Sequence, residues 1–193
     1  MPVDPSAVAT WANLVTIARM FIAPVMFLVI PDDGKGAWVA VVVWFFLCAS
    51  DGIDGYIARR HGVTSAGAFL DPLADKVLVL GAMFTLVSIG VFWVVPVIII
   101  AARELIISVY RVIVGGRGIS VPASKLGKYK TVCQQMAVGF ALLPLTALDA
   151  SWLWNGFLWA AVVLAVVSGA QYLWVARQMR PIDQATPVAG QVG

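Results

Sequence analysis

The 193-residue chain is too apolar to be a soluble globular domain. Hydrophobic residues make up 61% of it and charged residues only 12%, whereas soluble domains are usually about 25% charged. The net charge is +3, and no nucleic-acid partner is expected.

Long apolar runs predict an all-α integral membrane protein. Residues 77–102 and 150–176 contain no charged residue, the mean hydropathy is +0.93, and a helix needs about 20 residues to cross the hydrocarbon. Turn-forming residues divide the chain into six predicted transmembrane helices, near residues 12–31, 36–60, 69–90, 93–115, 126–148 and 151–177. We expect residues 1–180 to form one membrane domain and residues 181–193 to be a disordered tail.

The distribution of basic residues predicts the orientation in the inner (cytoplasmic) membrane. An even number of spans puts both termini on one side, together with the loops near 61–68 and 116–125. That side holds most of the lysines and arginines, namely Arg59, Arg60, Arg111, Arg117, Lys125, Lys128, Lys130, Arg177 and Arg180. The opposite side has only Lys35, so the positive-inside rule makes the termini cytoplasmic.

Four aspartates at the cytoplasmic ends of the second and third predicted spans indicate a metal site. Asp51 and Asp54 are spaced i, i+3, and Asp71 and Asp75 are spaced i, i+4, so each pair lies on one helix face. Four carboxylates brought together in a membrane repel one another and need counter-charge. Two divalent cations would neutralise them, and hard oxygen ligands favour Mg²⁺ or Mn²⁺. The alternative is that these acids are merely solvated helix ends.

Small residues beside the acids leave room for a nucleotide or diphosphate. Gly55, Ala58 and Gly67 each lie one turn from an aspartate, so little side-chain bulk surrounds the predicted metals. Arg59 could bind a phosphate or hold a carboxylate in place. For the glycines, close packing between helices is an equally good explanation.

The stretch from Asp51 to Asp75 resembles the signature of the CDP-alcohol phosphotransferases. That signature reads D-x2-D-G-x2-A-R, a variable gap, then G-x3-D-x3-D, and every fixed position is present here, with the shorter form of the gap. The resemblance implies a membrane enzyme that transfers a phosphatidyl group from CDP-diacylglycerol to an alcohol and releases CMP.

Flanking residues are similar to the members of this family whose acceptor is glycerol-3-phosphate. The similar segments are residues 13–19, 69–76, 102–104 and 126–131, followed by Gln134. The implied product is phosphatidylglycerophosphate. Other acceptors remain open, as in a cardiolipin synthase or a phosphatidylinositol-phosphate synthase, and so does a divalent-cation channel or transporter. Membrane lipid is an expected partner, and a homodimer is left open.

The resemblance also implies roles for individual residues. The metal ligands would be Asp51, Asp54, Asp71 and Asp75. The CDP moiety would be bound by Asp51, Asp54, Gly55, Arg59, Gly67 and Asp71. Asp75 would in addition be the general base that deprotonates the acceptor hydroxyl.

Basic residues in the fourth and fifth spans are candidates for binding the acceptor's phosphate. Arg103, Arg111 and Lys130 lie in or beside apolar segments, where an uncompensated charge is costly. A bound phosphate would compensate them. Alternatively, Glu104 could neutralise Arg103, while Arg111 and Lys130 extend to lipid head groups.

Overall fold

The computed structural model describes the backbone of residues 21–61, 65–115 and 125–178, and the side chains of these ranges except residues 51–75. Within these ranges every regular element is a helix, which confirms the all-α prediction. Residues 21–29 are helical. The following helices are α2 (Trp38–His61), α3 (Ser65–Ser88), α4 (Val94–Gly115), α5 (Lys125–Leu142), α6 (Pro144–Ala147) and α7 (Ser151–Gln178).

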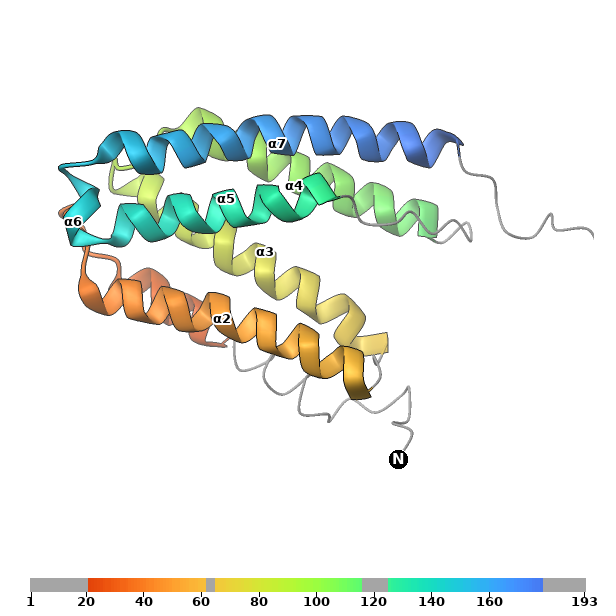
Figure 1. The fold of residues 1–193 in the computed structure, drawn as a ribbon, viewed down its shortest axis with the longest axis horizontal. Coiled ribbons are helices and arrows are strands. Elements are labelled where there is room, and N and C mark those ends of the chain that lie inside the picture. Colours follow the sequence, from red (N-terminus) through yellow and green to blue (C-terminus); the bar gives the residue numbers. More distant parts are fainter. Residues whose placement is uncertain (1–20, 62–64, 116–124, 179–193) are drawn as a thin grey trace, which may run out of the picture.

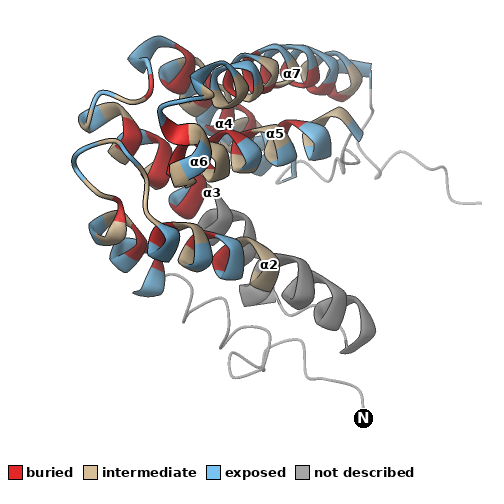
Figure 2. Cartoon of the chain, turned by 60° about the vertical axis from the view of Figure 1, so that its left-hand side comes forward, coloured by how far each residue is buried: buried red, intermediate tan, exposed pale blue. Residues whose placement is uncertain are grey.

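The long helices form a bundle in which α5 and α7 make the most extensive contact. These two helices run antiparallel, and α4 packs against α7. Helix α3 contacts α4 and α5 and lies between them and α2 (Figure 1). The buried residues of α4, α5 and α7 face the interior of the bundle, and the exposed residues lie on the outer faces of these helices (Figure 2). The fully buried core includes Met26, Met83, Ile100, Leu142 and Leu158.

The fifth predicted span is interrupted, which corrects the sequence-based boundary. A single helix was expected over residues 126–148, but α5 ends at Leu142 and a separate short helix, α6, begins at Pro144. Leu143 between them is extended, with φ −75° and ψ 118°. The α conformation is disfavoured for a residue that precedes proline, because the proline ring clashes with it. Proline also has no backbone N–H to continue the helix.

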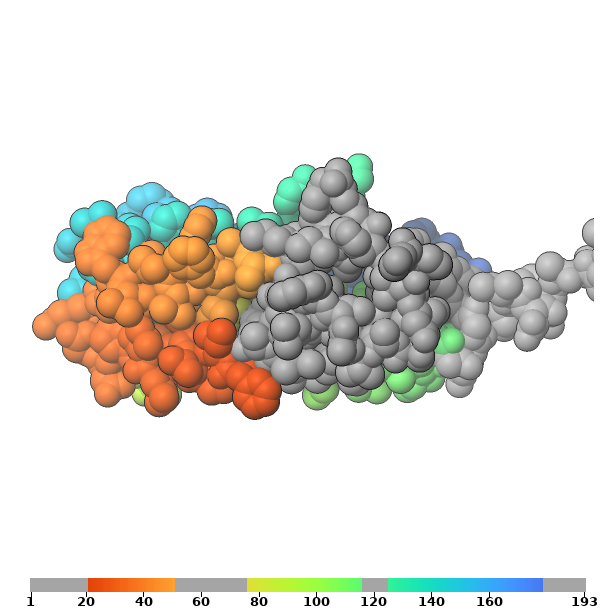
Figure 3. Space-filling view, turned by 90° about the horizontal axis from the view of Figure 1, so that it is seen from below, coloured from red at the N-terminus to blue at the C-terminus, as the bar shows by residue number. Residues whose placement is uncertain are grey.

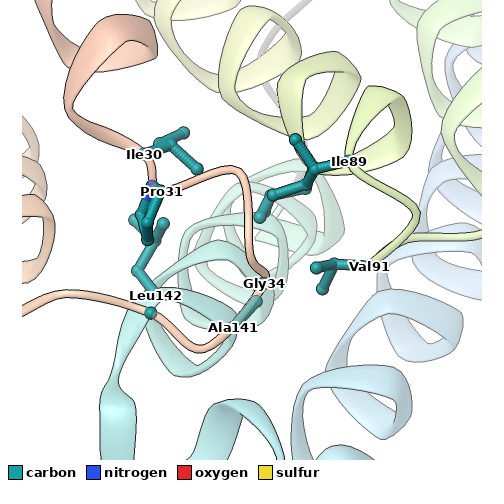
Figure 4. Close-up of a pocket in the computed structure, with 9 residues that line it drawn as sticks. Ile30, Pro31, Gly34, Ile89, Val91, Ala141 and Leu142 are labelled. Carbon is teal, nitrogen blue, oxygen red and sulfur yellow. The ribbon is translucent and has the colours of Figure 1, made fainter.

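Tight turns close the bundle at the end where α2 and α7 begin. Gly34 and Gly36 have φ of 67° and 76°, a region that favours glycine. A Cβ on Gly36 would overlap the Leu142 carbonyl oxygen. Ile30, Pro31, Ile89, Val91 and Leu142 gather around this turn and line a small apolar pocket (Figure 4).

One helix among the described residues, α7, is both long and apolar enough to cross a membrane. The segments Trp38–Ser50 and Lys76–Ser88 are apolar but shorter. Large hydrophobic side chains are nevertheless widely exposed, including Leu105 at 67% and Val112 at 66% on α4. Residues 21–50, which form the orange end of the face in Figure 3, expose mostly large apolar side chains: Phe21, Ile22, Val25, Leu28, Trp38, Val39, Val42, Phe45 and Phe46.

Candidate functional site

The acidic motif lies on two consecutive helices. Asp51 and Asp54 belong to α2, and Asp71 and Asp75 belong to α3. Their side chains, and those of Gly55, Arg59 and Gly67, lie outside the described residues, so the roles assigned to them remain predictions. Among the side chains that are described, no group of histidine, cysteine, aspartate and glutamate residues could hold a metal ion.

Lys76, which follows Asp75 directly, connects α3 to α4. Its Nζ donates a hydrogen bond to Ser108 Oγ at 2.6 Å. The Ser108 hydroxyl in turn donates to the backbone oxygen of Glu104 at 2.6 Å. The end of the acidic motif is therefore tied to the turn of α4 that contains Glu104.

A buried carboxylate, that of Glu104, binds two cations. Its Oε1 accepts hydrogen bonds from Arg103 Nη1 at 3.0 Å and from Lys130 Nζ on α5. The exposed fractions of the three side chains are 15% for Arg103, 9% for Glu104 and 6% for Lys130. Two positively charged side chains thus contact one buried carboxylate, at a place where charge interactions are strong because water is excluded.

Helix α7 holds the guanidinium of Arg103 in place. Arg103 Nε donates to the backbone oxygen of Ala165 at 3.1 Å, and Nη2 donates to Ser168 Oγ at 2.9 Å. A Cβ on Gly169 would lie 3.4 Å from Arg103 Cγ, so glycine leaves room for the arginine stem. We call Arg103, Glu104, Lys130 and Ser168 the Glu104 cluster; it joins α4, α5 and α7.

Arg111 lies apart from this cluster. It is exposed, and it is two turns beyond Arg103, or roughly 12 Å along the axis of α4. Its guanidinium carbon is 5.4 Å from the centroid of the Tyr172 ring, and Tyr172 makes an edge-to-face contact with Tyr110 at 6.3 Å. Of the three predicted phosphate ligands, the structure therefore brings together Arg103 and Lys130 but not Arg111.

A family model for the CDP-alcohol phosphatidyltransferases matches residues 9–167. The chain belongs to this family. A probable phosphatidylglycerophosphate synthase of Mycobacterium tuberculosis is 38% identical over 182 residues, which cover 91% of this chain and 84% of the relative. The CDP-diacylglycerol–glycerol-3-phosphate 3-phosphatidyltransferase of Bacillus subtilis is 35% identical over 83% of this chain and 91% of its own. The enzyme of the same name from Haemophilus influenzae is 33% identical over 84% and 90%.

Membership of the CDP-alcohol phosphatidyltransferase family confirms the resemblance found in the acidic motif and makes the protein a transferase. The match spans α2 to α6 and most of α7. The ion pair of Arg103 with Glu104 confirms the alternative that the sequence offered for Arg103. The sequence did not reveal that Lys130 shares this carboxylate, because that contact joins residues 26 apart in the chain. The sequence likewise did not predict that Ser168, a serine within an apolar span, accepts a hydrogen bond from Arg103.

Proposed function

We propose that this transferase moves the phosphatidyl group of CDP-diacylglycerol to glycerol-3-phosphate, giving phosphatidylglycerophosphate and CMP. The names of its relatives support this donor and this acceptor. Within the structure, the link from Lys76 through Ser108 to Glu104 supports it most directly. This link places the residue after Asp75 beside a buried pair of cations, so an acidic donor site and a basic acceptor site would adjoin.

The contacts between α2 and α5 support the same arrangement. The Ala37 N–H donates to the Leu142 oxygen at 3.0 Å, and Trp44 Nε1 donates to the Gln135 oxygen at 3.2 Å. From the first contact to the second, the residue number rises from 37 to 44 on the α2 side and falls from 142 to 135 on the α5 side. The two helices are therefore antiparallel, with equal spacing of the contacts. The two helices move apart toward their other ends (Figure 1), and the same register would bring Asp51 level with Lys128 along the bundle only, roughly 3 Å along the axis from Lys130.

The donor set of the acidic motif fits a pair of hard divalent cations. We assign Asp51, Asp54, Asp71 and Asp75 as ligands of Mg²⁺ or Mn²⁺, because four carboxylates on two helix faces suit these ions. Such ions, when bound, supply positive charge that stabilises the departing CMP. The CDP moiety would contact Asp51, Asp54, Asp71, Gly55, Arg59 and Gly67.

The residues around the acceptor would bind and deprotonate it. Arg103 and Lys130 hold the phosphate of glycerol-3-phosphate, and Arg111 attracts it at the exposed edge. Asp75 takes the proton of the attacking hydroxyl. A bond forms between that oxygen and the phosphatidyl phosphorus, while the bond from this phosphorus to the CMP oxygen breaks.

The exposed apolar side chains support a membrane location. The proposed layout has six spans in the inner membrane, both termini in the cytoplasm and the acidic site on the cytoplasmic side, following the basic residues of that side. Cysteines placed at 35 and at 61, in a protein without Cys48 and Cys133, would test it. An impermeant thiol reagent added to intact cells should label position 35 and not position 61; the reverse would contradict this orientation.

Purified protein in lipid micelles tests the reaction itself. We expect CMP release from CDP-diacylglycerol with glycerol-3-phosphate, little with phosphatidylglycerol or inositol phosphate, and none after chelation of divalent cations. Activity should return when Mg²⁺ or Mn²⁺ is added back. A clear preference for another alcohol would contradict the acceptor, and full activity in a chelator would contradict the metal assignment.

A further inference from the structure

Gln134 is a buried amide with an unused hydrogen-bond donor. It lies on α5 and is 3% exposed. Its Nε2 has no hydrogen-bond partner among the residues that the structure describes. A buried donor without a partner loses its bonds to water and gains none in return, so it reduces the stability of the fold.

The position of Gln134 places this amide beside the Glu104 cluster. Gln134 is one turn beyond Lys130 on the inner face of α5, so the two side chains are neighbours. The next buried residues on this face, Ala137 and Val138, are apolar. Gln134 is thus the last polar residue of the inner face before the apolar core begins.

We infer that Gln134 Nε2 donates a hydrogen bond to an oxygen of the phosphorylated acceptor held by Arg103 and Lys130. An amide nitrogen can only donate, and the acceptor molecule offers phosphate and hydroxyl oxygens. The cations attract the phosphate from any phosphorylated alcohol, whereas a neutral donor fixes how the molecule lies in the site. This inference rests on the proposed function, because the acceptor is the ligand that completes the amide's bonding.

The replacement Gln134→Met distinguishes binding of the acceptor from a structural role of the amide. If the amide binds the acceptor, the melting temperature and the KM for glycerol-3-phosphate should both rise; if it stabilises the fold, the melting temperature should fall. Methionine keeps the length and helix preference of glutamine but removes the unpaired donor. The melting temperature of the ligand-free protein should therefore rise, by about 2–4 °C. The KM for glycerol-3-phosphate should rise roughly two- to ten-fold, while the KM for CDP-diacylglycerol stays unchanged. Protection against heat by glycerol-3-phosphate should weaken in parallel.

Gln135→Met is the matched control. Gln135 is the next residue of α5 and only half-buried, and its backbone oxygen, which the substitution leaves in place, accepts the Trp44 bond. This variant should change neither KM value. Gln134→Glu is a second test that does not depend on a gain in stability. It puts a negative charge in place of the donor and should raise the acceptor KM at least as much as Gln134→Met.

Three results would overturn the inference. A lower melting temperature in Gln134→Met would mean that the amide is already bonded within the fold. An unchanged acceptor KM and unchanged protection in either folded variant would mean that it does not bind the acceptor. Wild-type protein assayed in parallel distinguishes this from failure of the proposed function: if it shows neither CMP release with glycerol-3-phosphate nor protection by that compound, both proposals are wrong.

Discussion

The two ends of the helix bundle are stabilised in different ways. At the end near Gly36, backbone turns and rings pack closely: Phe140 stacks on Phe157 with centroids 5.5 Å apart, and Phe92 lies 5.4 Å from Trp154. Toward the other end, α4, α5 and α7 meet through Arg103, Glu104, Lys130 and Ser168. One end is apolar and closed, and the other buries charge.

This difference indicates which end is adapted to binding. Apolar packing and satisfied backbone bonds stabilise a fold without any ligand. A buried ion pair is weak evidence for stability, and the two cations of this cluster, beside an unpaired amide, form the proposed binding site for the acceptor's phosphate. Substitutions at the closed end should therefore change stability, and those at the polar end should change catalysis as well.

Substitution of Glu104 should give the largest effect on stability and catalysis together, because its carboxylate joins α4 to α5 and holds the two cations of the proposed acceptor site. Glu104→Gln leaves Arg103 and Lys130 without their shared counter-charge, and breaking a buried ion pair costs about 3–5 kcal/mol. Unfolding in mixed micelles would measure the loss. Asp33→Asn is the control, since its ion pair with Lys35 is exposed and should contribute less than about 1 kcal/mol. Equal losses in both variants would contradict the comparison of the two ends.

Asp75→Asn should abolish most of the turnover while leaving the fold intact. Asparagine keeps the size of aspartate but cannot accept the proton of the acceptor hydroxyl, so turnover should fall by about 10²-fold or more. The rate of CMP release at saturating concentrations of both substrates measures this. Asp149→Asn, an exposed acid at the closed end, should be unaffected. Near-normal turnover in Asp75→Asn would remove Asp75 as the base.

Of the two substrates, the buried cations should affect the binding of the acceptor alone. Charge-assisted bonds contribute about 1.5–3 kcal/mol each, so Lys130→Gln or Arg103→Gln should raise the KM for glycerol-3-phosphate roughly ten- to a hundred-fold. The KM for CDP-diacylglycerol should stay nearly constant, and Arg59→Gln should show the reverse pattern. Unchanged KM values in well-folded Arg103→Gln and Lys130→Gln proteins would exclude both residues from the acceptor site.

Gly36→Ala tests the closed end. Alanine strains a backbone with φ of 76° and places a Cβ against the Leu142 carbonyl, so stability should fall by about 1–3 kcal/mol. The KM values of the folded enzyme should not change. Gly156→Ala is the control: it lies in α7 with nothing near its Cβ and should raise stability by up to about 1 kcal/mol. A changed acceptor KM in Gly36→Ala would show that the two ends are coupled.

The local features of the fold were predictable from the sequence. Apolar runs predicted the helices, and the breaks near Pro31, Gly90 and Gly115 matched the ends of elements. The interruption at Leu143 was missed, because the sequence around Pro144 is as apolar as the helix before it and only the proline signals the break. The acidic motif was recognised because helix periodicity and a family signature coincide there.

The contacts between distant helices were not predictable. Arg103 and Lys130 could be named as costly cations, and Glu104 as a candidate partner of Arg103, but the sequence could not show that Lys130 shares Glu104 or that α7 holds Arg103. Gln134 was noticed only as part of a similar segment. Its unpaired amide appears once α5 is packed against its neighbours, because burial is a property of the assembled bundle.

Arg111 should have the smallest effect of the predicted phosphate ligands. Its guanidinium is exposed and lies over the Tyr172 ring, and such a contact at an exposed site is worth about 0.5–1 kcal/mol. An exposed charge pair with the acceptor's phosphate contributes at most about 1 kcal/mol, so Arg111→Gln should raise the acceptor KM by no more than about five-fold. Because the site is open to solvent, this change should diminish as salt is added, whereas the effect of Lys130→Gln should persist. Tyr172→Leu should reproduce part of the Arg111→Gln effect, since it removes the ring that holds the guanidinium. A salt-independent rise of a hundred-fold in Arg111→Gln would instead place Arg111 in direct contact with the acceptor, beside the Glu104 cluster.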